Sequence, residues 1–396
     1  MEAIILAGGL GTRLRSVVSE VPKCMAPVAG IPFLKYLLDS LKTSSYGVSR
    51  VVLSVGYLRE IVMDWVQAHK EDYPFTFDYA VEETPLGTGG GIRLALERCT
   101  GDDVLILNGD TYFNADLGSL SAFHKASGSA ISIALKPMRN FERYGNVLTK
   151  GDLITEFKEK APCREGLING GIYAVSRSRL SPFFEGLPEK FSFETAVLPK
   201  VTSAGLCAGL TQDCYFIDIG IPEDYERAQR ELPELRQNMD LAHSDWTGFD
   251  TLLLDRDGVI NRQIVGDYVR RPDQFEFLPG VLEMMKAFSI HFRHILLVTN
   301  QRGVGKGLMS MKDLDEVHAY MQDEIRSHGG RLDGIYLSTA LTDDDPTRKP
   351  NPGLFLKAQS DYPDIRPEST VMIGDSDSDM EFAKNCGVKG IRIKKF

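Results

Sequence analysis

The first 110 residues alternate between short apolar runs and segments with apolar residues at helical spacing. Residues 3–6, 50–55 and 103–107 are short and largely apolar, which is typical of strands buried on both faces. Residues 33–41 and 58–68 repeat apolar side chains three and four positions apart, as a helix with one buried face does. This alternation predicts a parallel sheet with helices on both faces.

A second alternating series begins at Asp250. Apolar runs predict strands over 251–254, 295–298 and 371–373, and helical periodicity predicts helices over 282–289, 311–326 and 379–386. The sequence therefore predicts the α/β class for both halves of the chain.

The length of 396 residues is too great for one ordinary core and favours two domains. The polar stretch around Pro233 has few paired apolar positions and separates the two series. We predict one domain over 1–232, a linker over 233–247 and a second domain over 248–396. Both are expected to be Rossmann-like three-layer αβα domains.

Composition narrows the class of protein. Apolar residues make up 43% and charged residues 25% of the chain, as in globular enzymes. The net charge of −10 argues against a nucleic-acid partner. No uncharged apolar run reaches membrane-spanning length, and no signal peptide is recognised at Met1, so no membrane partner is expected. Six scattered cysteines fit a reducing compartment, which predicts a cytoplasmic protein.

Three glycines follow the first predicted strand. Gly8, Gly9 and Gly11 would let backbone amides approach a polyphosphate without an intervening Cβ. Arg13 and Lys23 supply charge for the phosphates or a departing pyrophosphate. The run lacks the third glycine of a dinucleotide fingerprint and the Gly-Lys-Ser/Thr of a P-loop. A tight strand-to-helix turn is the alternative interpretation.

The run 6–14, followed by Pro22-Lys23, resembles the signature of sugar-1-phosphate nucleotidyltransferases. The resemblance covers about the first 230 residues, on the usual size of a domain, and implies a GT-A-like fold. It adds Leu6 and Thr12 to the nucleotide site. It also implies that Gly87 and Thr88, in a loop over 86–90, receive the base and ribose of the nucleotide.

Later motifs resemble the same family in order. The resemblance implies that Asp110, which also contacts nucleotide, and Asp218 hold Mg²⁺. It implies that Glu159 and Lys160 hold the sugar hydroxyls and sugar phosphate, with Asn169 on a sugar-facing strand. In that reaction a sugar-phosphate oxygen attacks the α-phosphorus and pyrophosphate leaves. A helix cap at Asp110 and a turn at Asp218 are the alternatives.

Two aspartates, Asp255 and Asp257, follow the first predicted strand of the second series. Asp255 at a strand end can attack phosphorus, and Asp257 can protonate a leaving alcohol and then activate water. The acidic run containing Asp375 and Asp379 needs a cation such as Mg²⁺. We therefore expect Asp255, Asp257 and Asp375 to hold Mg²⁺, with Asp379 in support. An acidic turn with capping aspartates is the alternative.

This arrangement resembles the haloacid dehalogenase superfamily of phosphatases. The resemblance implies phosphate or substrate binding by Thr299, Asn300, Arg348 and Lys349, with Lys349 also catalytic. The local sequences are similar to heptose bisphosphate and histidinol phosphate phosphatases. Those relatives carry a Cys/His zinc loop, whereas residues 338–347 contain neither residue. The short intervals between motifs predict a minimal cap.

Both resemblances imply a heptose phosphate as the substrate. The N-terminal run is also similar to heptose 1-phosphate guanylyltransferases, so GTP and heptose phosphates are the expected small-molecule partners, with Mg²⁺ as cofactor. One alternative is mannose 1-phosphate guanylylation joined to an unrelated phosphatase. Another is a sensor of sugar phosphates in which one domain has lost catalysis. A homo-oligomer is left open.

Overall fold

The computed structural model describes residues 1–9, 14, 17–44 and 46–396. The chain divides into two compact units, Met1–Gln229 and Arg230–Phe396. In the described part of the chain, no helix has the length and apolar character needed to cross a membrane.

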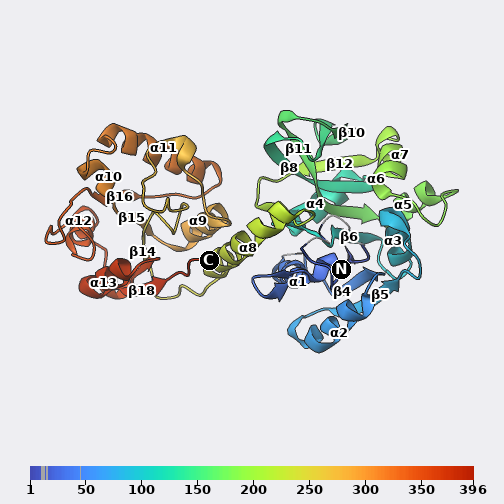
Figure 1. Ribbon diagram of the computed structural model, residues 1–396, viewed down its shortest axis with the longest axis horizontal. Coiled ribbons are helices and arrows are strands. Elements are labelled where there is room, and N and C mark those ends of the chain that lie inside the picture. The colour runs from blue at the N-terminus through green and yellow to red at the C-terminus, as the bar shows by residue number, and fades with distance from the viewer. Residues whose placement is uncertain (10–13, 15–16, 45) are drawn as a thin grey trace. The chain divides into compact units, whose positions relative to one another are not determined.

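In the described part of the first unit, nine strands form one sheet in the order β5-β4-β1-β6-β11-β8-β12-β10-β9 (Figure 1). These strands are β1 (Glu2–Leu6), β4 (Arg50–Val55), β5 (Thr76–Val81), β6 (Asp103–Asn108), β8 (Ile131–Phe141), β9 (Gly145–Lys150), β10 (Leu153–Lys160), β11 (Cys163–Ser176) and β12 (Cys207–Thr211). Two small sheets pair β2 (Pro27–Val28) with β3 (Ile31–Pro32), and β7 (Thr111–Phe113) with β13 (Phe216–Asp218). The helices are α1 (Phe33–Thr43), α2 (Arg59–His69), α3 (Gly87–Leu96), α4 (Leu117–Ser127), α5 (Arg177–Leu180), α6 (Phe193–Ala196) and α7 (Leu198–Ser203).

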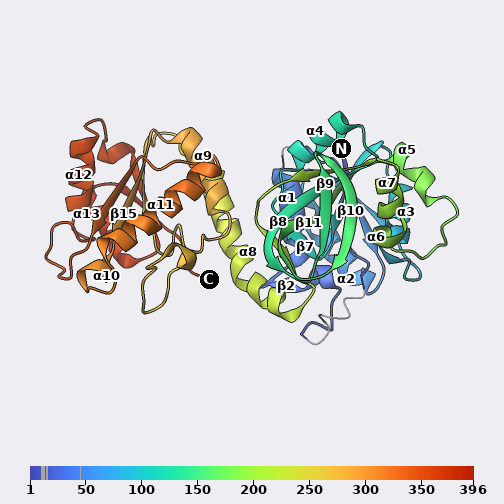
Figure 2. The ribbon, with the colours of Figure 1, turned by 90° about the horizontal axis from the view of Figure 1, so that it is seen from above.

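The early elements match the hydrophobic pattern, and the parallel sheet predicted from them is present, but later strands of this unit extend it in the antiparallel direction. Strands β5, β4, β1 and β6 are parallel, as expected. Strand β11 then runs antiparallel to β6 and β8, and β10 runs antiparallel to β9 (Figure 2). The reason is local: only Gly151 and Asp152 separate β9 from β10, and a two-residue connection can join only antiparallel strands.

Both faces of the parallel part of this sheet are buried. Ile4, Val52 and Ile106 pack in one cluster with Ile92 and Ala95 of α3. Side chains alternate between the faces of a strand, so the neighbouring residues face the other way. Ile5 and Leu53, two of these neighbours, are also fully buried. Burial on both sides explains why these strands are almost continuously apolar.

The described second unit has five parallel strands in the order β16-β15-β14-β17-β18. They are β14 (Thr251–Leu254), β15 (His294–Asn300), β16 (Gly334–Ser338), β17 (Thr370–Gly374) and β18 (Lys389–Arg392). The helices are α9 (Val281–His291), α10 (Arg302–Gly305), α11 (Met311–Ser327), α12 (Gly353–Asp361) and α13 (Asp377–Cys386). Every strand and helix predicted for this unit is present.

Helices cover both faces of this second sheet. Leu252 and Leu254 pack in one core cluster with residues of α9 and α11. Leu253 packs in a separate cluster with residues of α12 and α13. Figures 1 and 2 show these two helix pairs on opposite sides of the strands.

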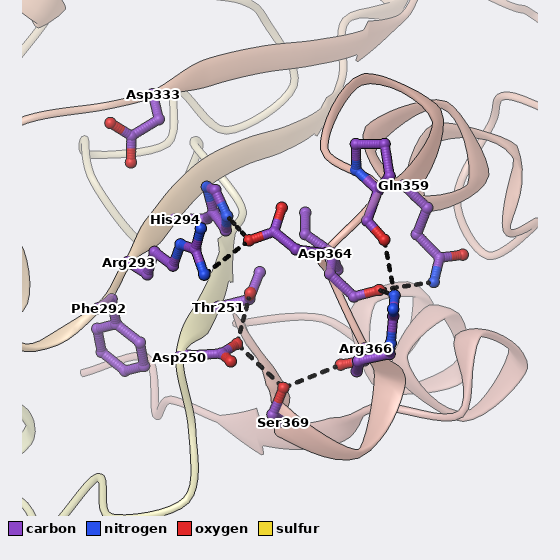
Figure 3. Close-up of polar contacts among 12 residues, drawn as sticks. Asp250, Thr251, Phe292, Arg293, His294, Asp333, Gln359, Asp364, Arg366 and Ser369 are labelled. Atoms are coloured by element: carbon purple, nitrogen blue, oxygen red, sulfur yellow. Dashed lines mark hydrogen bonds and ion pairs between the residues drawn. The ribbon is translucent and has the colours of Figure 1, made fainter.

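A polar cluster closes the amino ends of the strands of the second unit (Figure 3). Asp364 accepts a hydrogen bond from His294 Nε2 at 2.9 Å and pairs with Arg293 at 3.1 Å. Asp250 accepts from Thr251 at 2.9 Å and from Ser369 at 3.0 Å. These hydrogen bonds and ion pairs connect the segments at the amino edge of the sheet. In parallel sheets with helices on both faces, ligands bind at the opposite, carboxyl edge.

The predicted linker over 233–247 is wrong for most of its length. Helix α8 (Pro222–Ala242) contains Pro233 and continues to Ala242. Its C-terminal half belongs to the second unit, where Asn238 Nδ2 donates to Pro279 O at 2.8 Å. Leu235 is 2% exposed and lies against Gly280, where an added Cβ would be 2.8 Å from Leu235 Cδ1. In the sequence, the polar residues of the exposed side of the helix stand between those of the buried side, so the hydrophobic pattern does not predict the buried face.

We predict that Leu235→Ala lowers the free energy of unfolding of the second unit by roughly 2–5 kcal/mol, because it opens a cavity in a packed contact. Hydrogen exchange of peptides from β14 and β17 measures this loss. Arg236→Ala, at the adjacent exposed position, is the control and should leave the exchange unchanged. Equal protection in both variants would mean that this half of α8 is a solvated linker.

Candidate functional sites

The first cavity, of about 470 Å³, opens at the carboxyl ends of parallel strands in the first unit. Its wall includes residues 6–9 at the end of β1, Ser54 of β4 and residues 108–110 at the end of β6. β1 lies between β4 and β6 in the sheet, so the three strands end at one edge. The structure thereby brings Leu6, Gly8 and Gly9 together with Lys23, Gly87, Thr88 and Asp110, all predicted for the nucleotide site. The predicted residues Gly11, Thr12 and Arg13 lie outside the described residues.

Glu82 gives Gly8 a role that the sequence did not reveal. A Cβ on Gly8 would lie 2.7 Å from Glu82 Oε1, so a larger residue at position 8 would displace this carboxylate. Glu82 accepts hydrogen bonds from Ser54 Oγ and from the amide of Leu86, each at 3.0 Å. Gly9 has open space where a Cβ would stand. Because Glu82 is an acceptor with negative charge, the position beside Gly8 favours hydrogen-bond donors of a ligand and disfavours its phosphates.

The glycines after Leu86 do not form the expected loop but open helix α3. Gly87 has φ +71°, and a Cβ there would lie 2.6 Å from the carbonyl oxygen of Phe191. A Cβ on Gly89 would lie 2.2 Å from the Phe191 ring. Thr88 Oγ1 donates to Glu194 at 2.6 Å. The glycines therefore let the start of α3 pack closely against this segment while Gly87 and Thr88 line the cavity.

The small β7–β13 sheet brings two predicted metal ligands together. Register pairs Asp218 with Thr111, the residue after Asp110, and Ile219 N donates to Asp110 O at 3.0 Å. Lys23 Nζ lies 2.5 Å from Asp110 Oδ2 and 3.6 Å from Asp218 Oδ1. Because β7 follows Asp110, this residue does not cap a helix. Two carboxylates facing one point form the oxygen-only donor set that Mg²⁺ takes together with water.

The three residues predicted to bind the sugar phosphate lie on other strands. Glu159 and Lys160 are exposed at the end of β10. Asn169, in β11, donates from Nδ2 to Tyr173 at 2.9 Å and accepts from Gly171 N at 3.0 Å. None of the three is among the residues that line the described cavity. Their role stays a prediction.

Cys24 follows Lys23 in the wall of the first cavity and is a packing residue. Its side chain is 2% exposed. Burial raises the pKa of the thiol to about 12, so the nucleophilic thiolate is scarce at neutral pH.

A second cavity, of about 190 Å³, lies at the carboxyl edge of the second sheet. Asp255 follows β14, Asp375 follows β17, and Thr299 and Asn300 end β15. These strands are neighbours, so the sheet brings all four residues to one cavity together with Asp257 and Lys349. These residues, singled out by the motifs, thus line one cavity, and their roles stay predictions.

Lys349 joins two carboxylates inside this cavity. Its Nζ lies 2.8 Å from Asp255 Oδ1 and 2.5 Å from Asp379 Oδ1. The lysine side chain is 3% exposed and that of Asp379 is 1% exposed. Burial raises the pKa of Asp255 to about 6, against the opposing charge of Lys349, and Asp379 adds to the rise. A bound cation would favour the anionic, nucleophilic form of Asp255.

Three carboxylates in the described residues are arranged to hold a cation. Oxygen atoms of Asp255, Asp375 and Asp379 lie within 4.8 Å of one another. Gly258, at φ +90°, makes room for them, because a Cβ there would lie 1.9 Å from Asp375 Oδ2. This oxygen set fits Mg²⁺. Asp379, predicted only to support the metal, belongs to the group, whereas the side chain of Asp257, predicted as a ligand, does not.

Asp257 lies instead in a buried network that the motifs did not assign. Both of its oxygens accept from Arg256 Nη2 at 2.9 Å, and Asn261 and Gln301 donate at 3.0 and 2.9 Å. Burial alone would raise the pKa of Asp257, but these donors hold it below its usual value. His318 Nε2 lies 3.1 Å from Arg256 Nη1. Arg256 is fully buried although it stands between two aspartates in the sequence.

The residues predicted to bind phosphate divide into two groups. Thr299 is 1% exposed, lines the cavity and accepts from Gln301 Nε2 at 3.0 Å. Asn300 also lines the cavity and holds the backbone of Lys349, with hydrogen bonds of 3.0 and 3.1 Å. Arg348 instead donates to Asp343 at 2.9 Å and is not among the residues that line the described cavity.

Known proteins match the two units separately. A family model described as nucleotidyl transferase matches residues 2–234, and one described as HAD-hydrolase-like matches residues 346–395. A D-glycero-α-D-manno-heptose 1-phosphate guanylyltransferase of Aneurinibacillus thermoaerophilus is 45% identical over 232 residues, or 59% of this chain and 98% of the relative. A mannose-1-phosphate guanylyltransferase of Mycobacterium tuberculosis is 32% identical over 238 residues, or 59% of this chain and 64% of the relative.

A relative of the second unit is also known by its activity. A D-glycero-α-D-manno-heptose-1,7-bisphosphate 7-phosphatase of Mycobacterium tuberculosis is 45% identical over 135 residues, or 34% of this chain and 71% of the relative. The chain therefore belongs to the nucleotidyl transferase family over residues 2–234 and carries a HAD-like hydrolase of the heptose bisphosphate phosphatase kind after it.

Proposed function

We propose that this chain is a bifunctional enzyme that makes GDP-heptose. The second unit removes the 7-phosphate of D-glycero-α-D-manno-heptose 1,7-bisphosphate. The first unit transfers GMP from GTP to the resulting heptose 1-phosphate and releases pyrophosphate. One observation carries the proposal: the two units of one chain are similar to two different enzymes. Removal of the 7-phosphate from the sugar substrate of one enzyme would give the sugar substrate of the other.

The phosphatase step follows from the second cavity. An oxygen of Asp255 attacks phosphorus, the ester oxygen leaves, and an aspartyl-phosphate forms. Asp257 is proposed as the general acid and then the base. Because its hydrogen-bond donors favour the anionic form, it must take up a proton when substrate binds before it can protonate the leaving alkoxide, and it then takes a proton from the water that hydrolyses the intermediate. Lys349 and the Thr299 hydroxyl hold phosphoryl oxygens. Mg²⁺ held by Asp255, Asp375 and Asp379 would neutralise charge on the transferred group.

The transferase step needs positioning and charge more than covalent chemistry. A phosphate oxygen of heptose 1-phosphate attacks the α-phosphorus of GTP, and the bond to pyrophosphate breaks. Lys23 supplies positive charge beside Asp110 and Asp218 at this point. Mg²⁺ held by these aspartates would stabilise the charge that develops on the phosphates. Glu159, Lys160 and Asn169 are proposed to contact the sugar phosphate.

Glu82 supports GTP as the nucleotide. Guanine presents two adjacent donors, N1–H and the N2 amino group, and a carboxylate is an acceptor on both oxygens. Uracil and thymine present a single N–H between two carbonyl oxygens, which a carboxylate repels. Glu82 lines the first cavity beside Gly8. It directly follows strand β5 and is distant in sequence from both Lys23 and Asp110.

The architecture supports the finer fold assignment as well. We infer two Rossmann-like αβα domains, GT-A-like up to about residue 229 and HAD-like beyond it, on the strand orders and the helices on both faces. Between β14 and α9 the described chain has one short 3-10 helix, Pro272–Gln274, which is consistent with a minimal cap. The six cysteines are scattered along the sequence with no metal-ligand spacing, which favours a reducing, cytoplasmic location.

Mannose 1-phosphate remains the alternative sugar for the first unit. It is favoured by the mannose-specific relative at 32% identity, but that identity is lower than the 45% of the heptose-specific relative. Comparison of kcat/KM for the two sugar 1-phosphates with GTP decides between them, and a higher value for mannose 1-phosphate would replace the heptose assignment.

Asp255→Asn should abolish phosphate release, by at least about 10³-fold, because it removes the nucleophile. The same variant should still form nucleotide sugar from heptose 1-phosphate and GTP. Asp110→Asn should give the reverse pattern. Phosphate and pyrophosphate release are measured separately on each full-length variant. Retention of its own reaction by either variant would contradict the assignment of that site.

Glu82→Gln should lower kcat/KM for GTP by roughly 10–100-fold and raise the relative use of UTP, because an amide N–H₂ cannot accept from guanine. Glu83→Gln is the matched control, since Glu83 is 78% exposed and pairs with Arg59. Parallel losses for GTP and UTP in Glu82→Gln would show that Glu82 supports the fold and does not select the base.

A further inference from the structure

Residues 393–394, after β18, are fixed by hydrogen bonds to β17 and α8. Ile393 is 4% exposed, and its amide donates to Gly374 O at 2.9 Å. The amide of Lys394 donates to Gln237 Oε1 at 2.8 Å, and Gln237 Nε2 donates back to Lys394 O at 3.2 Å. Three hydrogen bonds therefore hold the backbone next to Lys395.

Lys395 places an ammonium group on the wall of the second cavity. Its Nζ lies 2.8 Å from Asp375 Oδ2 and 3.0 Å from Gln263 Oε1. The Lys395 side chain is 57% exposed, whereas Asp375 is 4% exposed and Lys349, the other lysine of the cavity, is 3% exposed. One lysine thus lies deep in the cavity and the other at its mouth.

Lys395 is more than half exposed, so solvent screening reduces what its ion pair with the buried Asp375 contributes to folding stability. Stability alone therefore does not account for this anchored lysine. An ammonium has three N–H donors, and acceptors among the described residues engage two of them at these distances. A further donor is available to a ligand that enters the cavity.

The size of the cavity indicates what that ligand is. About 190 Å³ is smaller than the roughly 300–1,000 Å³ of a site that encloses a small molecule. The cavity can enclose the scissile phosphoryl group beside Asp255, Thr299 and Lys349, while the remainder of a sugar bisphosphate extends through the mouth. The second phosphate then meets the exposed end of Lys395.

We propose that Lys395 binds the phosphate that is not cleaved and so selects sugar bisphosphates over monophosphates. The inference rests on the proposed phosphatase function and adds a specificity-determining residue to it. Lys395 makes a charge-assisted hydrogen bond to this distal phosphate. It takes no part in bond breaking, so its effect falls on substrate binding.

The test compares Lys395→Met with Lys394→Met in the full chain at saturating Mg²⁺. Lys394 is an adjacent exposed lysine, so the control removes the same charge. Phosphate release gives KM and kcat for heptose 1,7-bisphosphate, and competitive inhibition gives Ki for orthophosphate, which occupies only the scissile-phosphate position. Lys395→Met should raise KM roughly tenfold or more, the equivalent of one charged hydrogen bond. Its kcat and the Ki of orthophosphate should stay near wild type, and Lys394→Met should resemble wild type throughout.

Two results would overturn the inference. An unchanged KM in Lys395→Met would show that Lys395 does not bind substrate. Equal rises in KM and in the orthophosphate Ki would show that Lys395 acts through Asp375 and the metal cluster. Failure of the wild-type protein to cleave the bisphosphate would instead overturn the proposed function, and that result is read before any variant is compared.

Discussion

In each unit, a lysine ammonium lies between two carboxylates, and each site depends on this arrangement. Lys23 lies between Asp110 and Asp218, and Lys349 lies between Asp255 and Asp379. Each pair of carboxylates comes from elements that lie far apart in the sequence. Removal of Lys349 would leave the buried charge of Asp379 uncompensated, which costs several kcal/mol as an order of magnitude. Asp110 is 38% exposed, so solvent screens the Lys23 pair and the cost there is smaller. The lysines thus hold together carboxylates that would otherwise repel.

Parallel strands explain why both sites form where they do. Neighbouring parallel strands end at the same edge, so residues that follow separate apolar runs converge there. In the second unit this rule alone brings Asp255, Thr299 and Asp375 into one cavity. In the first unit the rule accounts for Gly8 and Asp110, but Asp218 reaches the site through the short β13 strand paired with β7.

Much of the fold could be predicted from the sequence, because buried strands and amphipathic helices have distinct periods. The strands over 50–55 and 251–254 have the predicted bounds. Of the antiparallel strands β8 to β11, only the part of β11 around Asn169 is expected, through the family resemblance, since half-exposed strands such as β10 lack long apolar runs. Helix α8 was taken for a linker because its buried residues Leu232 and Leu235 stand among charged ones around Pro233.

The motifs predicted the reacting groups of both sites but not their supporting residues. Glu82, Arg256 and Gln301 act through contacts with distant segments, and a sequence pattern does not contain such distances. The central claim is that one chain carries both steps. Its most direct test is mass spectrometry of a reaction containing the full-length protein, D-glycero-α-D-manno-heptose 1,7-bisphosphate, GTP and Mg²⁺. The account predicts GDP-heptose with release of orthophosphate and pyrophosphate, whereas unchanged bisphosphate, or heptose 1-phosphate that accumulates beside unused GTP, would contradict it.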